Sequence, residues 1–544
     1  MVLLRHRRAT DTTAPPTQPG TEGPLMRLRL ALPVAAVAGL ALNLAYQPTG
    51  WWPMALVGVG LSLATLIGRS VGAALLVGVV FGAVFYGLHL AWVGQFLGPI
   101  PRLALSGLEA LLTAAGAVPI VLAYRWTARG TRRSAAQLIL VPLLIGGIWV
   151  SREVVIGAWP YDGFPWARLG MTQVDGPFRE VASWTGVTGL SFLIAAVAAG
   201  LLQWARAGGW RFGRGALPAA ITVSVMLIVP QFPTTDAGTF TVGWVQGNGP
   251  AGYFDQKNPG DVLVAQKTVS ERISGARIDL LVWPEGSVDS DAFATPDTAA
   301  TLTQVTTSVG APLLANGATT RDGRTFNTSF LWDPDATNRQ LHDKVNPVPF
   351  GEYVPDRWFY ERLVPDLVGL IQREYTPGSN APVVNLRGVP IGLAICFDVI
   401  FDRVIWDGFD HGAQLYVFQT NNADFRGSSE NLQQLAFAKM RAIETGRAVV
   451  NISTVGTSQA LSPDGTVIDT LPVDTAAGTV TTLPLRTGRT PASVIGPRST
   501  GLFPVLSVGA MLSLGIIHRR RRPRDAANAP AAPEGRSPVE GHAS

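Results

Sequence analysis

The sequence predicts an integral-membrane protein in which a bundle of about eight transmembrane helices carries one polar α/β domain. Three observations predict this architecture. Long apolar runs occupy the first half and the end of the 544-residue chain, but none occurs between residues 238 and 485. Within that polar stretch, short β-branched runs alternate with helical patterns. Arginines cluster at one set of run ends, as they do at the cytoplasmic ends of membrane helices.

Eight apolar runs approach the length of about 20 residues that a helix needs to cross a bilayer. Seven precede the polar stretch and one follows it. They fall near residues 28–46, 50–68, 71–96, 103–124, 136–155, 186–204, 215–231 and 499–517. The sequence therefore predicts a seven-helix bundle within residues 25–232 and a closing transmembrane helix over 499–517.

The positions of the arginines predict the orientation of the chain. Four clusters precede the first run or follow the fourth, sixth and eighth runs, so with eight spans they all lie on one side of the membrane. The positive-inside tendency assigns that side to the cytoplasm. Both termini are then cytoplasmic, and the domain over 238–485 is extracytoplasmic. The clusters are Arg5, Arg7, Arg8, Arg27 and Arg29; Arg125, Arg129, Arg132 and Arg133; Arg206, Arg211 and Arg214; and Arg519–Arg522 with Arg524.

The two ends of the chain are rich in Pro, Ala, Thr and Gly. Residues 1–24 are therefore expected to form a disordered cytoplasmic tail, and residues 518–544 a basic and then disordered one. No small-residue cleavage signal follows the first apolar run, so we interpret that run as an anchor. The net charge of +5 comes mainly from the arginines beside the membrane runs, so no nucleic-acid partner is expected.

The polar stretch is predicted to form a layered α/β domain, because its strands alternate with helices. Helices are expected over 261–275, 297–308 and 429–445, and the last carries a core-facing stripe of Leu432, Leu435, Ala436, Met440 and Ile443. Strands are expected over 239–246, 278–283, 311–315, 327–331, 389–395, 413–418 and 448–452, with a hairpin over 461–467.

Cys396 follows the predicted strand 389–395 and is the only cysteine in the chain. A single cysteine excludes an intrachain disulfide and a metal site built from several cysteines. An unpaired cysteine on its own is most simply an inert core residue. The residues that accompany it favour a nucleophile instead.

Glu285 and Lys344 also lie near the ends of predicted strands. A thiol becomes a strong nucleophile only when it ionises, which requires a base or a positive charge nearby. Glu285 has the chemistry of the base. Lys344 has a compact ammonium that suits an oxyanion better than a planar guanidinium does. Seen alone, each is more simply a surface charge.

Glu285, Lys344 and Cys396 occur in the order of the Glu–Lys–Cys set of the nitrilase, or carbon–nitrogen hydrolase, superfamily. The string Pro349-Phe350-Gly351-Glu352-Tyr353-Val354-Pro355 resembles the apolipoprotein N-acyltransferase family of that superfamily, and Arg441-Ala442-Ile443-Glu444-Thr445-Gly446-Arg447 matches the superfamily again. This resemblance implies a four-layer α-β-β-α sandwich over about residues 240–485.

The resemblance also implies the chemistry. Glu285 would act as base, Lys344 as oxyanion partner, Cys396 as nucleophile, and Glu352 would orient Lys344 or aid proton transfer. Phe397 and Asp398 stand where the family commonly has Tyr and Glu, so they are expected to support the site. The implied acyl donor is a phospholipid and the implied acceptor is the N-terminal amine of a diacylated lipoprotein, with no cofactor and no metal.

Two other functions are compatible with parts of the sequence. A membrane-anchored nitrilase-type amidohydrolase would use the same three residues. One membrane helix would be enough to anchor such an enzyme, so the seven predicted spans before the polar domain argue against it. A transporter or sensor would carry polar groups inside its spans, and here only His89 and Glu109 stand out as exceptions. No zinc-protease or serine-hydrolase motif occurs.

The stretch 356–373 carries an apolar stripe with aromatic neighbours. A surface helix packed on the domain is the simpler interpretation. Trp and Tyr beside leucines also suit a membrane–water interface, and Pro365 divides the stretch into short pieces. We expect a lid on the membrane beside the active site that gates access of acyl chains. The stripe is Phe359, Leu363, Leu367, Leu370 and Ile371, flanked by Trp358 and Tyr360.

Overall fold

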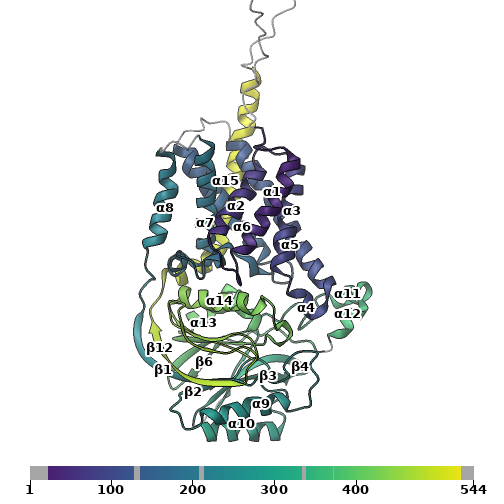
Figure 1. The fold of residues 1–544 in the computed structure, drawn as a ribbon, viewed down its shortest axis with the longest axis vertical. Coiled ribbons are helices and arrows are strands. Elements are labelled where there is room, and N and C mark those ends of the chain that lie inside the picture. Colours follow the sequence, from purple (N-terminus) through teal and green to yellow (C-terminus); the bar gives the residue numbers. More distant parts are fainter. Residues whose placement is uncertain (1–22, 128–134, 208–213, 334–338, 372, 528–544) are drawn as a thin grey trace, which may run out of the picture.

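A computed structural model describes residues 23–127, 135–207, 214–333, 339–371 and 373–527. A helical bundle stands on an α/β sandwich, and the chain passes from one to the other at residues 229–234 and 488–490 (Figure 1). Most of the predicted tails, 1–22 and 528–544, lie outside the described residues. So do Arg129, Arg132, Arg133 and Arg211 of the predicted arginine clusters.

The bundle contains eight apolar helices, together with the short helix α4 (Val93–Leu97). Five of the eight are long and apolar enough to cross a membrane, so the chain is an integral-membrane protein. The other three, α1, α2 and α8, have 17, 14 and 12 residues, so the count of eight spans stays a prediction. The eight are α1 (Leu28–Leu44), α2 (Pro53–Leu66), α3 (Val71–His89), α5 (Pro99–Thr127), α6 (Ala135–Ile156), α7 (Ala182–Arg206), α8 (Leu217–Ile228) and α15 (Pro491–Ala527).

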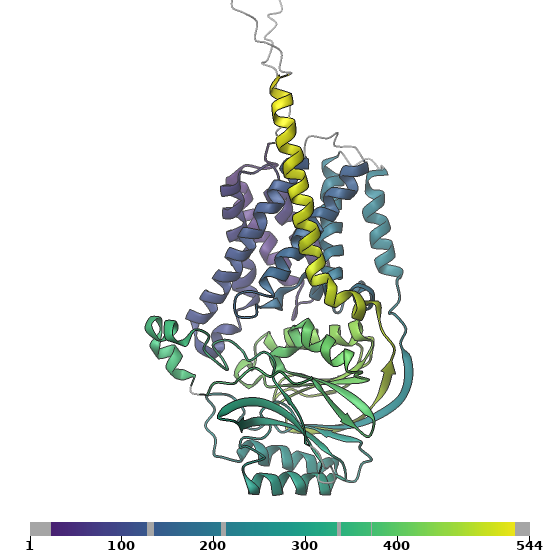
Figure 2. The same ribbon diagram turned by 180° about the vertical axis from the view of Figure 1, so that it is seen from behind.

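The closing helix α15 is longer than the sequence analysis predicted. It begins at Pro491 instead of 499 and continues to Ala527 instead of ending at 517. It leaves the sandwich, crosses the whole bundle and projects beyond it (Figure 2). The basic stretch after 517, predicted as part of a tail, therefore continues this helix, because arginines favour helices as strongly as most residues do.

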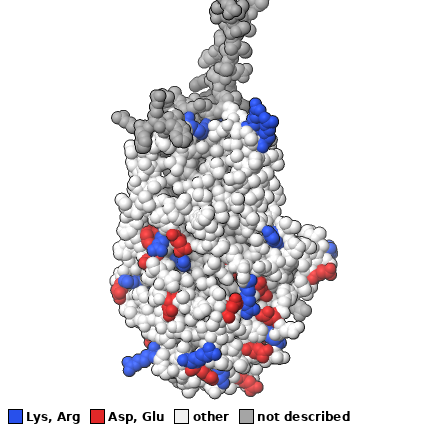
Figure 3. Space-filling view, viewed as in Figure 1, with Lys and Arg blue, Asp and Glu red and all other residues white. Residues whose placement is uncertain are grey.

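Arginines gather at the end of the bundle that lies away from the sandwich. Arg69 donates to the carbonyl of Met26 over 2.9 Å, and Arg125 donates to the carbonyl of Arg69 over 2.7 Å. Between this end and the sandwich, the face shown in Figure 3 is almost free of charged side chains. An uncharged band with one basic edge is the surface expected of a helical bundle in a bilayer.

Two six-stranded sheets form the sandwich. Their strand orders are β12-β1-β2-β3-β4-β5 and β11-β10-β9-β8-β7-β6. The first contains β1 (Thr235–Gln246), β2 (Leu280–Val282), β3 (Leu313–Arg321), β4 (Arg324–Trp332), β5 (Gln340–Asp343) and β12 (Ala477–Thr487). The second contains β6 (Val383–Leu386), β7 (Val389–Ile395), β8 (Leu415–Thr420), β9 (Ala448–Ser453), β10 (Ser458–Leu461) and β11 (Val467–Leu471).

Apolar side chains fill all three spaces between the layers. Val242 and Trp244 of the first sheet pack against Ile391 and Val417 of the second. The outer face of the first sheet is covered by α9 (Asp261–Ser270) and α10 (Pro296–Val309). The second sheet is covered by α13 (Asp402–Asp410) and α14 (Glu430–Thr445), which lie beneath the bundle (Figure 1). The predicted α-β-β-α sandwich is confirmed.

Helix α14 is buried on nearly every side, because it lies between a sheet and the bundle. Leu435, Ala436, Met440 and Ile443 of the predicted stripe are buried and Leu432 is half-buried. Polar contacts join this layer to the segment between α6 and α7 and to the first turns of α7. Lys439 lies 3.0 Å from Asp175, Arg168 lies 2.5 Å from Asp402, and Glu444 accepts from the backbone N–H of Val187 over 2.7 Å.

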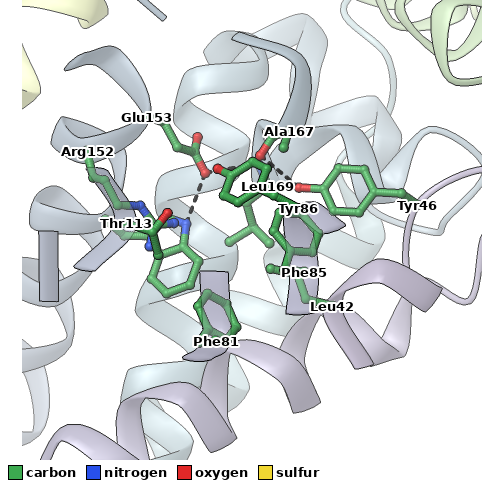
Figure 4. Close-up of a pocket in the computed structure, with 11 residues that line it drawn as sticks. Leu42, Tyr46, Phe81, Phe85, Tyr86, Thr113, Arg152, Glu153, Ala167 and Leu169 are labelled. Carbon is green, nitrogen blue, oxygen red and sulfur yellow. Dashed lines mark hydrogen bonds between the residues drawn. The ribbon is translucent and has the colours of Figure 1, made fainter. Parts of the chain in front are cut away.

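The bundle holds a polar pocket that the sequence analysis missed (Figure 4). Arg152 and Glu153 lie within the apolar run 136–155, so naming only His89 and Glu109 as exceptions in the spans was wrong. Arg152 lies over the Trp149 ring at 4.0 Å, and Glu153 accepts from the Trp149 indole and from the backbone N–H of Leu169, each over 3.0 Å. The polar content of the spans therefore gives no argument against a transporter.

Candidate active site

Cys396 stands where β7 ends and a short 3-10 turn, Cys396–Ile400, begins. The strand lies next to the edge strand of its sheet and is paired on both sides, with β6 and with β8, so the position of the residue is rigidly set. Cys396 has a φ of 50°, a conformation that costs a non-glycine residue about 1–3 kcal/mol. Strained backbone of this kind is concentrated at functional sites and presents the half-buried thiol at the end of the sheet.

Glu285 and Lys344 meet in one buried ion pair. Glu285 follows β2 and Lys344 follows β5, and the lysine Nζ lies 3.0 Å from the Glu285 Oε1. Glu352 binds the same ammonium from the other side, at 2.8 Å. Asn327 donates to both carboxylates, over 2.8 Å to Glu285 and 3.0 Å to Glu352. The structure thus brings together Glu285, Lys344 and Glu352, which were predicted, with Asn327, whose role was not.

Burial and charge set the pKa values of this cluster. Burial alone would lower the pKa of Lys344, but the charges of Glu285 and Glu352 outweigh it and raise that pKa well above its usual value. The lysine therefore stays protonated. Burial raises the pKa of Glu285, although Lys344 opposes the shift. Burial, and next the charge of Glu285, raise the pKa of the Cys396 thiol, while Lys344 lowers it. The three groups are thus close enough to influence one another.

Asp398 connects the cysteine turn to the lysine loop. Its carboxylate accepts from the backbone N–H of Val345 over 3.1 Å, and from the backbone N–H and the side-chain amide of Asn346 over 2.8 and 2.7 Å. The side chain is fully buried, so it fixes the two loops relative to each other. Phe397 points to the bundle, where its ring stacks on Phe164 with centroids 6.0 Å apart.

Two side chains of helix α14 donate hydrogen bonds to Cys396 and to the turn that follows it. Arg441 is 1% exposed and donates to the carbonyls of Val399 and Ile400, each over 3.0 Å. Gln434 donates to the Cys396 sulfur over 3.3 Å. The sequence analysis used the apolar positions of this helix and missed Gln434. A polar residue at a buried helical position beside the predicted stripe was the available signal.

The predicted lid forms two short helices, α11 (Arg357–Leu363) and α12 (Pro365–Leu370), separated at Pro365 as expected. Trp358 and Leu363 are 65% and 64% exposed. Phe359 and Leu370 are also exposed, and Leu367 is half-buried.

Ile371 was assigned to the wrong face of the stripe. It is buried with Val354 and Val368, because the chain changes direction at Pro365 and α12 turns this side inward. Helices α11 and α12 lie at the edge of the molecule, near α4 (Figure 1), and leave Phe359, Leu363 and Leu370 exposed. The Tyr253 hydroxyl donates to the carbonyl of Leu370 over 2.8 Å, and the Phe96 ring of α4 lies 5.9 Å from the Tyr253 ring.

Comparison with known proteins identifies two regions of the chain. Residues 38–200 match the apolipoprotein N-acyltransferase N-terminal domain, and residues 242–489 match carbon-nitrogen hydrolase. The apolipoprotein N-acyltransferase of Mycolicibacterium smegmatis is 31% identical, over 90% of this chain and 86% of that protein. That of Shewanella oneidensis is 26% identical, over 92% of this chain and 97% of that protein.

Among solved structures, the chain is similar to a CN-hydrolase superfamily protein from Xanthomonas campestris. The identity is 18% and the TM-score 0.35, over 56% of this chain and all of that chain. An amidase of the nitrilase superfamily from Nesterenkonia gives 18% identity and a TM-score of 0.36, over 50% of this chain and 98% of that chain.

Proposed function

The chain belongs to the apolipoprotein N-acyltransferase family, and we propose that it acylates lipoproteins through a thioester on Cys396. The donor is a phospholipid, and the acceptor is the N-terminal amine of a diacylglyceryl-cysteine lipoprotein. The observation that carries this proposal is the buried Glu285–Lys344–Glu352 cluster, which acts on the pKa of a thiol placed at the bundle side of the sandwich.

In the first step, Glu285 takes the proton of the Cys396 thiol as the sulfur attacks the ester carbonyl carbon of the phospholipid. The Lys344 ammonium and the backbone N–H of Phe397 stabilise the oxyanion that forms. The ester C–O bond then breaks, the leaving oxygen receives the proton from Glu285, and lysophospholipid departs. Glu352 and Asn327 hold Lys344 and Glu285 in place during this step.

In the second step, the amine of the lipoprotein attacks the thioester and forms the amide. Glu285 takes a proton from the amine nitrogen and returns it to the departing sulfur, which restores the thiol. Division of acyl transfer into two steps through a sulfur ester is covalent catalysis. Both substrates are lipids, so a site beside the bundle receives them from the membrane and limits the access of water.

The proposed orientation in the membrane is inferred from the arginine-rich end of the bundle. Arg27, Arg69 and Arg125 lie at the end away from the sandwich, which we assign to the cytoplasm. The catalytic domain, residues 238–485, is then extracytoplasmic and both termini are cytoplasmic. The helices α11 and α12 form a lid at the outer membrane surface, where Trp358, Phe359, Leu363, Leu367 and Leu370 contact lipid.

Mass spectrometry of the full-length protein incubated with phospholipid tests the proposal. We expect an acyl adduct on Cys396, its discharge by a diacylated lipopeptide, and no adduct in the folded Cys396→Ala and Cys396→Ser variants. Lipopeptide acylation by Cys396→Ala at the wild-type rate would contradict the mechanism. Cleavage of small amides without acyl transfer to the lipopeptide would favour the amidohydrolase instead.

A further inference from the structure

The side chain hydrogen-bonded to the Cys396 sulfur comes from an element outside the Glu–Lys–Cys set. Gln434 of α14 is 2% exposed and directs its amide Nε2 at the sulfur over 3.3 Å. An N–H group in this position stabilises a thiolate more than a thiol, because hydrogen bonds to charged acceptors are the stronger ones.

Neighbouring hydrogen bonds fix which end of the Gln434 amide faces the sulfur. The Ser453 hydroxyl accepts from the backbone N–H of Gly456 over 3.0 Å and donates to the Asn422 Oδ1 over 2.6 Å. Asn422 therefore turns its Nδ2 toward the Gln434 Oε1, at 3.0 Å, and the Glu430 Oε2, at 2.7 Å. With its oxygen occupied in this way, Gln434 presents its nitrogen to the sulfur.

The sulfur needs a donor of this kind. Burial raises the pKa of the Cys396 thiol first, and the charges of Glu285, Glu430 and Glu352 raise it further, whereas Lys344 alone among these groups lowers it. Lys344 is itself held by the two carboxylates Glu285 and Glu352. A neutral N–H donor at the sulfur stabilises the Cys396 thiolate. It adds no positive charge, which would form an ion pair with the nearby carboxylates instead of with the sulfur.

We propose that Gln434 is a further catalytic residue, which stabilises negative charge on the Cys396 sulfur in both steps of acyl transfer. The inference rests on the proposed function, in which Cys396 is the nucleophile. In the first step, the thiol proton passes to Glu285 and the Gln434 N–H donates to the resulting thiolate. In the second, the amine nitrogen bonds to the thioester carbon, the C–S bond breaks, and its electron pair returns to the sulfur, which again accepts from Gln434.

The test measures how the rate of Cys396 alkylation by iodoacetamide depends on pH in the detergent-solubilised full-length protein. The chain has one cysteine, so the reaction reports this thiol alone. Gln434→Met keeps the shape of the side chain and removes the donor. We expect the midpoint of the profile to rise by about one pH unit or more, and both acylation and transfer to the lipopeptide to slow.

Gln433→Met is the matched control. Gln433 is also buried and polar, but it binds the indole N–H groups of Trp92 and Trp166 and the carbonyl of His89. We expect its loss to destabilise the fold comparably and to leave the alkylation midpoint unchanged. An equal rise in both variants would assign the effect to loosened packing and would overturn the proposal.

Gln434→Glu provides a second variant in case the methionine is not tolerated, since it keeps an oxygen facing Asn422 and places no N–H at the sulfur. We expect its midpoint to rise as well. A wild-type profile in Gln434→Met or Gln434→Glu would overturn the role of Gln434. Alkylation does not require acyl transfer, so this result is independent of whether Cys396→Ala abolishes lipopeptide acylation.

Discussion

A single lysine lies between two carboxylates beside the Cys396 thiol. Removal of a charge from a buried cluster of this kind leaves the remaining charges uncompensated, which costs about 3–5 kcal/mol. The two ion pairs therefore hold Lys344 in place and keep it protonated, so an ammonium group stays next to the thiol. Substitutions in it change the charge and the shape of the site together, so variants that separate the two are informative.

Lys344→Arg is expected to be nearly as damaging as Lys344→Ala. Lys344 is 2% exposed, and a planar guanidinium does not fit a pocket shaped around a compact ammonium. Loss of an oxyanion donor lowers turnover by about 10²–10³-fold, measured as acylation of a fluorescent lipopeptide. Lys267→Arg, on α9 and outside the site, is the control and should keep wild-type turnover. Turnover of Lys344→Arg within a few-fold of wild type would show that charge alone matters.

Glu285→Gln is expected to separate thiol acidity from catalysis. The negative charge of Glu285 raises the pKa of Cys396, so its removal lowers that pKa and shifts alkylation of the thiol to lower pH. Acyl transfer should nevertheless fall by about 10²–10⁴-fold, because the base is lost. Glu271→Gln, which lies outside the site, should change neither property. Alkylation of Glu285→Gln at higher pH than wild type would contradict the assigned electrostatics.

At the scale of elements, the sequence predicted best the segments whose own residues determine their structure. Strand β7 has the predicted bounds, Val389–Ile395, and α14 begins one residue after its predicted start. Both are strongly patterned and buried. The short helix α13 (Asp402–Asp410) and the strand β12 (Ala477–Thr487) were not predicted. Strand β12 contains several threonines and is held by pairing with β1, more than 200 residues earlier in the chain, which no local pattern encodes.

The candidate site follows the same division. Glu285 and Cys396 follow strands that the sequence predicted, whereas Lys344 was selected from its order in the Glu–Lys–Cys set, because the strand before it, β5, was not predicted. Asn327 and Gln434 were not selected, because their contacts with Glu285 and Cys396 join elements that are distant in the sequence. Ile371 was assigned to the wrong face because the prediction treated 356–373 as one continuous helix. The chain changes direction at Pro365, between α11 and α12, so Ile371 is buried.

The lid hypothesis predicts a selective defect when Leu363 and Leu370 are both replaced by Asp. These residues are 64% and 39% exposed, so the fold tolerates the change, while lipid contact does not. Burial of a leucine is worth about 1.5–3 kcal/mol, so acylation by phospholipid should slow by about tenfold or more. Acylation by a short-chain soluble thioester should stay near wild type.

Val264→Asp on α9 is the control for the lid experiment. Val264 is 59% exposed on the layer farthest from the bundle, so both donors should react normally (Figure 1). An equal loss with both donors in the lid variant, or a loss of folding, would favour a helix packed on the domain for structural reasons alone.

At the scale of the whole molecule, the sandwich is joined to the bundle by more than two linkers. Arg168 of the segment between α6 and α7 pairs with Asp402, which also pairs with Arg441 at 2.8 Å. Arg441 in turn holds the turn after Cys396. A continuous series of ion pairs and hydrogen bonds therefore connects the end of the bundle to the turn after Cys396. These contacts fix the turn that follows Cys396 relative to the adjoining end of the bundle.

The orientation of the molecule is open to a direct test, because Cys396→Ala leaves the chain free of cysteine. Single cysteines are placed in that background at Thr307 on α10 and at Ser70, the residue that caps α3. Both positions are exposed and lie at opposite ends of the molecule. With the basic end in the cytoplasm, a membrane-impermeant maleimide should label Thr307→Cys in intact spheroplasts and Ser70→Cys only after permeabilisation. The reverse pattern would place the catalytic domain in the cytoplasm and would contradict the assignment of the arginine-rich end.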